Sequence, residues 1–105
     1  MQSGQEIVQI VISNLKPDAS RARFMELTNE MKKWLLSQDG FVSYEVYEND
    51  LHWADKIAYV DKESAERINQ LFMRTEIAKE MLNYVEPDYT AFMGKSADVY
   101  RHGDA

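Results

Sequence analysis

The sequence contains no cysteine among its 105 residues. This excludes a disulfide framework, a thiolate nucleophile and a cysteine-ligated zinc or iron–sulfur site. The absence fits a reducing compartment. The first residues also carry neither the basic start nor the long apolar run of a signal peptide. We therefore expect a cytoplasmic protein.

A surplus of basic residues and a long apolar run are missing as well. The chain has 12 Lys and Arg against 18 Asp and Glu, a formal net charge of −6. A nucleic-acid-binding protein normally presents a basic face, whereas the basic residues here are scattered and their closest cluster is Lys32-Lys33. No apolar stretch approaches the roughly 20 residues that cross a bilayer. We expect neither nucleic acid nor membrane as a partner.

The remaining composition is that of a small globular protein. Hydrophobic residues make up 45% and charged residues 29%, values that are ordinary for a folded domain. The length fits one domain over residues 1–105, with a core over about 6–94 and a C-terminal tail over 95–105.

The spacing of apolar residues divides the chain into strands and helices. β-branched and aromatic residues predict strands, and apolar residues at 3.6-residue spacing predict helices. Thr75 followed by Glu76 resembles a second helix start, so we expect a bend or break near 73–75. The expected strands are 6–14, 41–48, 52–60 and 89–94, and the expected helices are about 20–37 and 61–85.

This order, β-α-β-β-α-β, predicts an α+β fold of the ferredoxin-like kind. In this arrangement a four-stranded antiparallel sheet carries two helices on one face.

The strands carry apolar side chains on both of their faces. Val8, Ile10 and Ile12 share one face of the first strand, and Ile7 and Val11 share the other. Strict alternation in the hairpin likewise sets Phe41 and Tyr47 against Val42, Tyr44 and Val46. An open face with this much apolar surface indicates an interface. We therefore expect a homodimer that forms through the open sheet face.

Four short motifs resemble those of the antibiotic biosynthesis monooxygenase family. They are Lys16-Pro17-Asp18, the run from Asp39 to Glu45, the run from Asp61 to Ala65, and Arg74-Thr75-Glu76. The resemblance spans residues 6–94. It implies a dimeric α/β barrel with a pocket between sheet and helices in each subunit, which takes a small apolar or aromatic ligand. The family includes cofactor-independent oxygenases of polycyclic phenols and quinols, and haem-degrading enzymes.

Two positions differ from the family pattern. Val60 stands where many members have a Trp, and Phe72 lies in the region where members often have a His. Haem degradation depends on such a His, so the resemblance favours an oxygenase without a cofactor. We expect a cofactor-independent monooxygenase acting on a phenolic, quinol-like or polyketide-like molecule. The alternative is a non-catalytic protein of the same fold that binds a small apolar ligand or serves in a stress response.

Three residues are candidates for catalysis. The pKa of a His side chain lies near neutrality, so His52 is a candidate general base. Asn14, at the end of the first strand, is a candidate for orienting a ligand carbonyl, and Tyr59 offers a phenol that hydrogen-bonds an oxygenated substrate. The alternatives are a solvated His52, an Asn14 that makes a turn, and a Tyr59 ring packed in the sheet.

Three further residues are candidates for binding substrate: Tyr44, Trp53 and Phe72. The alternative for these aromatic side chains is packing in the core. Asp50, His52 and Asp55 are residue types that bind metals, but no second His lies near them, and we expect no metal site.

Overall fold

The computed structural model describes residues 5–98 and 100–103. Its elements follow the order β-α-β-β-α-α-β. The strands are β1 Ile7–Asn14, β2 Phe41–Asn49, β3 His52–Tyr59 and β4 Thr90–Lys95. The helices are α1 Arg21–Leu36, α2 Lys62–Phe72 and α3 Glu76–Tyr84.

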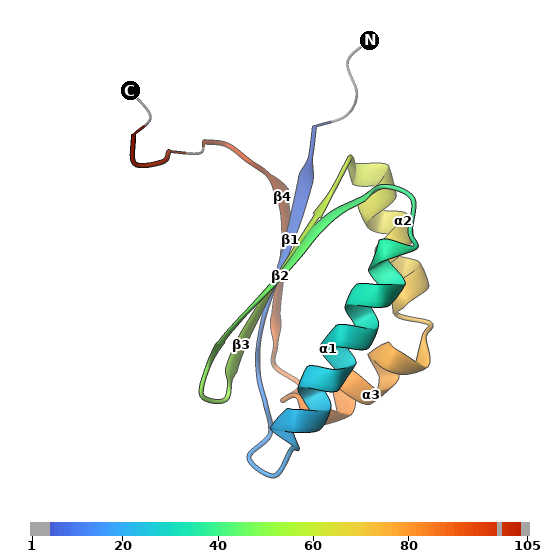
Figure 1. Ribbon diagram of the computed structural model, residues 1–105, viewed down its shortest axis with the longest axis vertical. Helices are drawn as coiled ribbons and strands as arrows, with labels where there is room; N and C mark the ends of the chain where they lie inside the picture. Colours follow the sequence, from blue (N-terminus) through green and yellow to red (C-terminus); the bar gives the residue numbers. More distant parts are fainter. Residues whose placement is uncertain (1–4, 99, 104–105) are drawn as a thin grey trace.

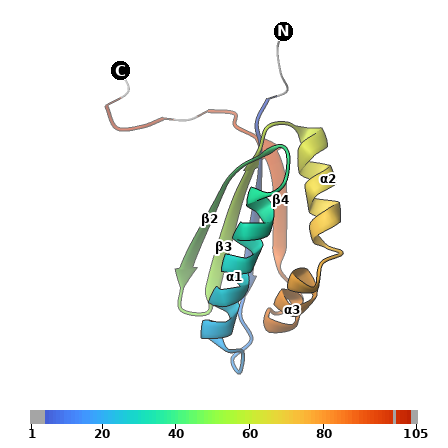
Figure 2. The ribbon, with the colours of Figure 1, turned by 45° about the vertical axis from the view of Figure 1, so that its right-hand side comes forward.

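The four strands form one antiparallel sheet in the order β2-β3-β1-β4. Figure 1 shows all three helices on one side of this sheet, and Figure 2 shows α1 beside the pair α2 and α3. The expected ferredoxin-like fold is confirmed. The expected break in the second helical segment is also confirmed, because that segment forms two helices.

Each helix begins at a residue whose side chain accepts a hydrogen bond from the first turn. Ser20 accepts from the backbone N–H of Arg23, Asp61 from that of Ser64, and Thr75 Oγ1 from that of Ala78. Such capping satisfies an N–H that has no partner within the helix. The Thr75 cap starts α3 as a new helix, which turns its axis away from α2.

The turn after α1 requires a glycine. Gly40 has a φ of 99°, in the left-handed region, which glycine adopts without steric cost. A Cβ at this position would lie 2.5 Å from Ser64 Oγ. The turn therefore packs directly against the start of α2, and a larger residue would push the two apart.

A β-bulge makes the predicted alternation in β2 wrong at its first two residues, Phe41 and Val42. The register with β3 shifts between Phe41 and Ser43, which places Phe41 against the core together with Tyr44 and Val46. Because a bulge inserts one extra residue, the side chains before it point to the opposite faces from those that strict alternation predicts. Val42 is exposed as a result.

The core lies between the helices and the helix-facing side of the sheet. Its most deeply buried large side chains are Leu15, Leu27, Leu35, Tyr59 and Ile68. Within the part of the chain that the structure describes, no helix combines the length and apolar character needed to span a membrane.

Candidate functional site

A cavity of about 230 Å³ lies between the sheet and the helices. We call it the helix-face cavity. Its apolar wall includes Phe24, Met31, Ile57, Phe72, Met81 and Val85. Its polar side chains are Gln9 and Ser13 from β1, Asp55 from β3 and Asn69 from α2. An apolar cavity with a few converging polar groups is the usual form of a small-molecule site.

Strand register brings the polar groups of β1 and β3 to the same face. Gln9 lies opposite Ile57, and Asp55 lies opposite Val11. Residues opposite one another in antiparallel strands point to the same side of the sheet, and alternate residues share a face. Gln9 and Asp55 are therefore diagonal neighbours on the helix-facing side.

Asp55 is the acidic group of the cavity. Burial raises the pKa of its carboxyl to about 6, with a partial offset from the Tyr44 hydroxyl beside it. The pKa of the Tyr44 phenol is also raised, first by burial and then by the negative charge of Asp55. A carboxyl with a pKa near neutrality exchanges protons readily under physiological conditions.

Three buried polar atoms near the cavity have no hydrogen-bond partner among the described residues. They are Asp55 Oδ1, Tyr44 Oη and Trp53 Nε1. Buried polar atoms are paired in the great majority of cases, so an unpaired one calls for an explanation. Asp55 and Tyr44 lie close enough to shift each other's pKa. Of the three residues Asp55 lines the cavity, where a donor group of a bound ligand would supply a partner for its Oδ1.

A chain of three polar side chains lies at the side of the cavity formed by β1 and α2. Tyr59 Oη donates to Gln9 Oε1 over 3.1 Å, and Gln9 Nε2 donates to Asn69 Oδ1 over 3.3 Å. Burial raises the pKa of the Tyr59 phenol to about 12, so it keeps its proton. Tyr59 is almost fully buried, whereas Asn69 lines the cavity.

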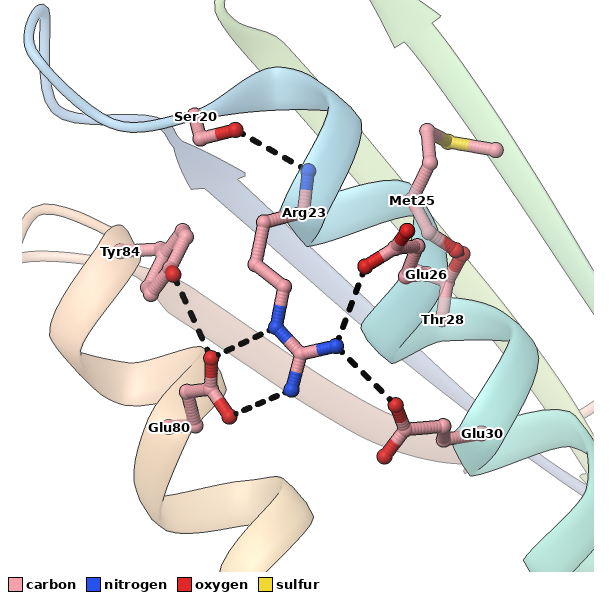
Figure 3. A network of polar contacts seen from close by, with 8 residues as sticks. All are labelled: Ser20, Arg23, Met25, Glu26, Thr28, Glu30, Glu80 and Tyr84. Carbon is pink, nitrogen blue, oxygen red and sulfur yellow. Dashed lines mark hydrogen bonds and ion pairs between the residues drawn. The ribbon is translucent and has the colours of Figure 1, made fainter.

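The α3 wall of the cavity is held to α1 by an ion-pair cluster, shown in Figure 3. Arg23 donates two hydrogen bonds of 2.8 Å to Glu80 and one each to Glu26 and Glu30. Tyr84 donates to Glu80 over 3.3 Å. Hydrogen bonding to Arg23 lowers the pKa of Glu80 and raises that of Arg23.

The structure places four of the six predicted site residues on the cavity side of the sheet. Phe72 lines the cavity, and Tyr59 reaches it through Gln9. Tyr44 packs against the core. Trp53 is buried, with its ring centroid 5.0 Å from that of Phe24 in the cavity wall.

The other two, His52 and Asn14, do not line the cavity. They pair across β1 and β3, and His52 Nδ1 contacts Asn14 Oδ1. Trp53 is buried, so its neighbour His52 points to the open face of the sheet, where it is exposed. Their predicted catalytic roles stay predictions.

The sequence-based choice of site residues passed over Gln9 and Asn69, and it considered Asp55 only as a metal ligand. The position of Asp55 in the sequence nevertheless indicates that its side chain faces the core. It alternates in phase with Trp53, Ile57 and Tyr59, so a carboxyl in that phase faces the core. Among the described residues, no group of three or more His, Cys, Asp or Glu side chains is arranged to hold a metal ion.

Comparison of the sequence with known proteins finds no matching family model and no matching curated protein. Solved structures do match. SnoaB, a cofactor-independent oxygenase from Streptomyces nogalater, superposes in a mutant form with a TM-score of 0.80 at 11% identity, covering 91% of this chain and 97% of SnoaB. The chain has the fold of this oxygenase.

Two further structures show the same fold. Rv0793 from Mycobacterium tuberculosis has a TM-score of 0.76 at 15% identity, covering 91% of this chain and 99% of its own. An antibiotic biosynthesis monooxygenase has a TM-score of 0.71 at 13% identity, covering 88% of this chain and 99% of its own. The resemblance seen in the sequence is confirmed at the level of the fold. Activity does not transfer with fold alone.

Proposed function

We propose that this protein is a cofactor-independent oxygenase of small phenolic or quinol-like molecules. The observation that carries the proposal is Asp55, a carboxyl with a buried, unpartnered oxygen in a largely apolar cavity. Molecular oxygen reacts with electron-rich carbanions and phenolates far more readily than with neutral phenols. A base that ionises the substrate in a dry site therefore replaces the metal or flavin that other oxygenases use.

In the proposed reaction, Asp55 accepts the proton of the substrate hydroxyl. The pKa of about 6 leaves this carboxyl ionised at neutral pH, while its burial makes it a stronger base than a solvated Asp. The phenolate then reacts with O2 at its para carbon. One oxygen atom stays on the ring as a quinone oxygen, and the other leaves as water with the two hydrogens of the substrate. The substrate supplies all the electrons.

The size of the cavity limits the substrate. An apolar cavity of about 150 Å³ is known to hold benzene. The 230 Å³ present here therefore has room for a molecule of one or two rings. The exposed side chains Met73, Leu82 and Tyr89 also belong to the cavity lining. A longer apolar substituent would leave the cavity beside them.

Oxygen uptake by metal-free protein tests the proposal. We expect uptake with one- and two-ring phenols that carry a hydrogen at the para carbon, and a chelator should leave the rate unchanged. The quinone formed should carry one atom of labelled oxygen when the reaction runs under labelled O2. If a broad panel of such phenols consumes no oxygen, the proposed function is wrong.

The second candidate function is ligand binding without chemistry. It is supported by the same cavity and by Val60 and Phe72, which stand where family members often have Trp and His. A ligand that binds only the folded state raises the melting temperature. Stabilisation by small apolar molecules without oxygen uptake would favour this candidate, and no stabilisation by any of them would exclude it.

We also propose that the protein is a homodimer formed through the open face of the sheet. On that face Ile12 is 53%, Tyr47 54% and Phe92 59% exposed. The antiparallel pairing of Ile10 with Phe92 continues the apolar surface from β1 onto β4. Two such faces would bury each other's apolar side chains. Sedimentation at micromolar concentration should give twice the chain mass, and Phe92→Asp should give one.

A further inference from the structure

The Tyr59–Gln9–Asn69 chain has a fixed hydrogen-bond direction. The Tyr59 phenol holds its proton, and among the described residues Gln9 is the partner to which it donates. Gln9 Oε1 is thereby fixed as the acceptor and Gln9 Nε2 as the donor to Asn69 Oδ1. The reverse orientation of both amides would leave the buried hydroxyl hydrogen of Tyr59 without a partner, which is costly.

One donor is left over at the cavity end of this chain. Because Asn69 Oδ1 accepts from Gln9, the Asn69 Nδ2 group keeps its hydrogens, and no described residue accepts them. Asn69 lines the cavity, so this donor is available to a ligand. The proton on Tyr59, at the buried end, therefore decides what the cavity recognises at its other end.

This donor and the Asp55 carboxyl line the same cavity. Gln9, which orients the donor, is the diagonal neighbour of Asp55 on the adjacent strand. A ligand that uses both groups therefore carries a hydroxyl at one end and a hydrogen-bond acceptor at the other.

We propose that Asn69 determines the specificity of the helix-face cavity, with its Nδ2 donating to a carbonyl oxygen of a ligand whose hydroxyl lies at Asp55. This deepens the proposed oxygenase function and rests on it for the reaction, but the recognition is measurable without turnover. Tyr59 and Gln9 are positioning residues in this proposal, since they act through Asn69.

The test compares two ligands that differ by one carbonyl oxygen, 4-hydroxyacetophenone and 4-ethylphenol, by calorimetry without oxygen. Both have a blocked para carbon, so they report binding alone. For the wild-type protein we expect the ketone to bind about tenfold more tightly than the alkyl phenol, the value of one net hydrogen bond. Equal affinity for the two ligands would overturn the proposal.

Asn69→Asp replaces the donor by an acceptor of the same shape. We expect the tenfold preference to disappear, because the carbonyl oxygen would meet a carboxylate oxygen. Asn83→Asp is the matched control, since it makes the same change in charge at an exposed position of α3. A preference retained in Asn69→Asp would overturn the proposal, as would a preference lost equally in both variants.

Asn69→Leu and Tyr59→Phe keep the test decisive if the added charge unfolds the first variant. Asn69→Leu removes the donor without adding a charge and should also abolish most of the preference. Tyr59→Phe frees Gln9 to rotate, so the preference should fall by a smaller factor. A preference unchanged in both variants contradicts the assignment.

The two proposals fail separately. A ketone preference that depends on Asn69, found together with no oxygen uptake from any phenol, supports the recognition and excludes the oxygenase. Oxygen uptake with a ligand preference that ignores Asn69 supports the oxygenase and excludes this recognition.

Discussion

Two polar clusters of this protein differ in how their groups are paired. Around Arg23, on the solvent side of α1 and α3, every carboxylate drawn in Figure 3 contacts the guanidinium. Around Asp55, on the inner side of the sheet, Asp55 Oδ1, Tyr44 Oη and Trp53 Nε1 are buried without partners among the described residues. The carboxylates of the exposed Arg23 cluster are all paired, whereas these three atoms of the buried Asp55 cluster are not.

Pairing of polar groups has its smaller effect on stability at the surface and its larger effect in the interior. An exposed ion pair adds little to stability, because water already solvates its charges, whereas an unpaired buried polar group costs free energy. The helix-facing side of the sheet therefore carries a cost that packing alone does not explain. We interpret the Arg23 cluster as structural and the Asp55 cluster as functional, since strain of this kind concentrates at active and binding sites.

The largest expected effect distinguishes the two clusters by activity. Asp55→Asn removes the proposed base and should lower kcat/KM for a phenolic substrate by about 100-fold or more, the usual contribution of a general base. Glu80→Gln is the matched change in the other cluster and should leave kcat/KM within about twofold. Oxygen-uptake kinetics check both values. Equal losses in the two variants would contradict the interpretation.

The fold was more accessible from the sequence than the site. Periodicity gave the strand and helix order, and Thr75-Glu76 gave the helix break. The bulge near Phe41 was missed because nothing in the composition of β2 marks an extra residue. The site depends on which side chains meet between elements far apart in sequence. Gln9 and Asn69, separated by 60 residues, meet only because α2 packs on β1.

The second expected effect is a pH dependence of stability. Burial raises the pKa of Asp55 in the folded state to about 6 from an ordinary 3.8. The folded state therefore binds the proton more tightly than the unfolded state between these values. The free energy of unfolding should fall as pH rises through this range, by about 3 kcal/mol in total, and stay level above it.

Urea unfolding of the wild type and of Asp55→Asn from pH 4 to pH 8 isolates this contribution. The difference between the two proteins should shift in favour of the variant as pH rises, most steeply between pH 4 and pH 6. A difference that does not change with pH would show that Asp55 titrates normally. The Asp55 cluster would then lack the burial cost that sets it apart.

A smaller effect is expected from Tyr44→Phe, which leaves Asp55 without its neighbouring hydroxyl. That hydroxyl lowers the pKa of Asp55 against the stronger effect of burial, so its removal should raise the pKa further. The acidic limb of the profile of kcat/KM against pH should move to higher pH, with a loss of less than about tenfold at its maximum. If the acidic limb does not move, Tyr44 does not influence the ionisation of Asp55.

The smallest expected effect concerns the Arg23 cluster. Its contribution to stability depends on pH with the opposite sign to that of Asp55. Hydrogen bonding to Arg23 lowers the pKa of Glu80, so this carboxylate stabilises the fold above its ordinary pKa of 4.5 and loses that contribution as pH falls. Glu80→Gln should lower the midpoint of thermal unfolding slightly at pH 7. The difference from the wild type should shrink in 1 M NaCl, because salt screens exposed charges, and at pH 3. A difference that persists at high salt would mean that Glu80 acts through packing of α3 on α1. The contrast between a charged surface cluster and a strained interior cluster would then depend on Asp55 alone.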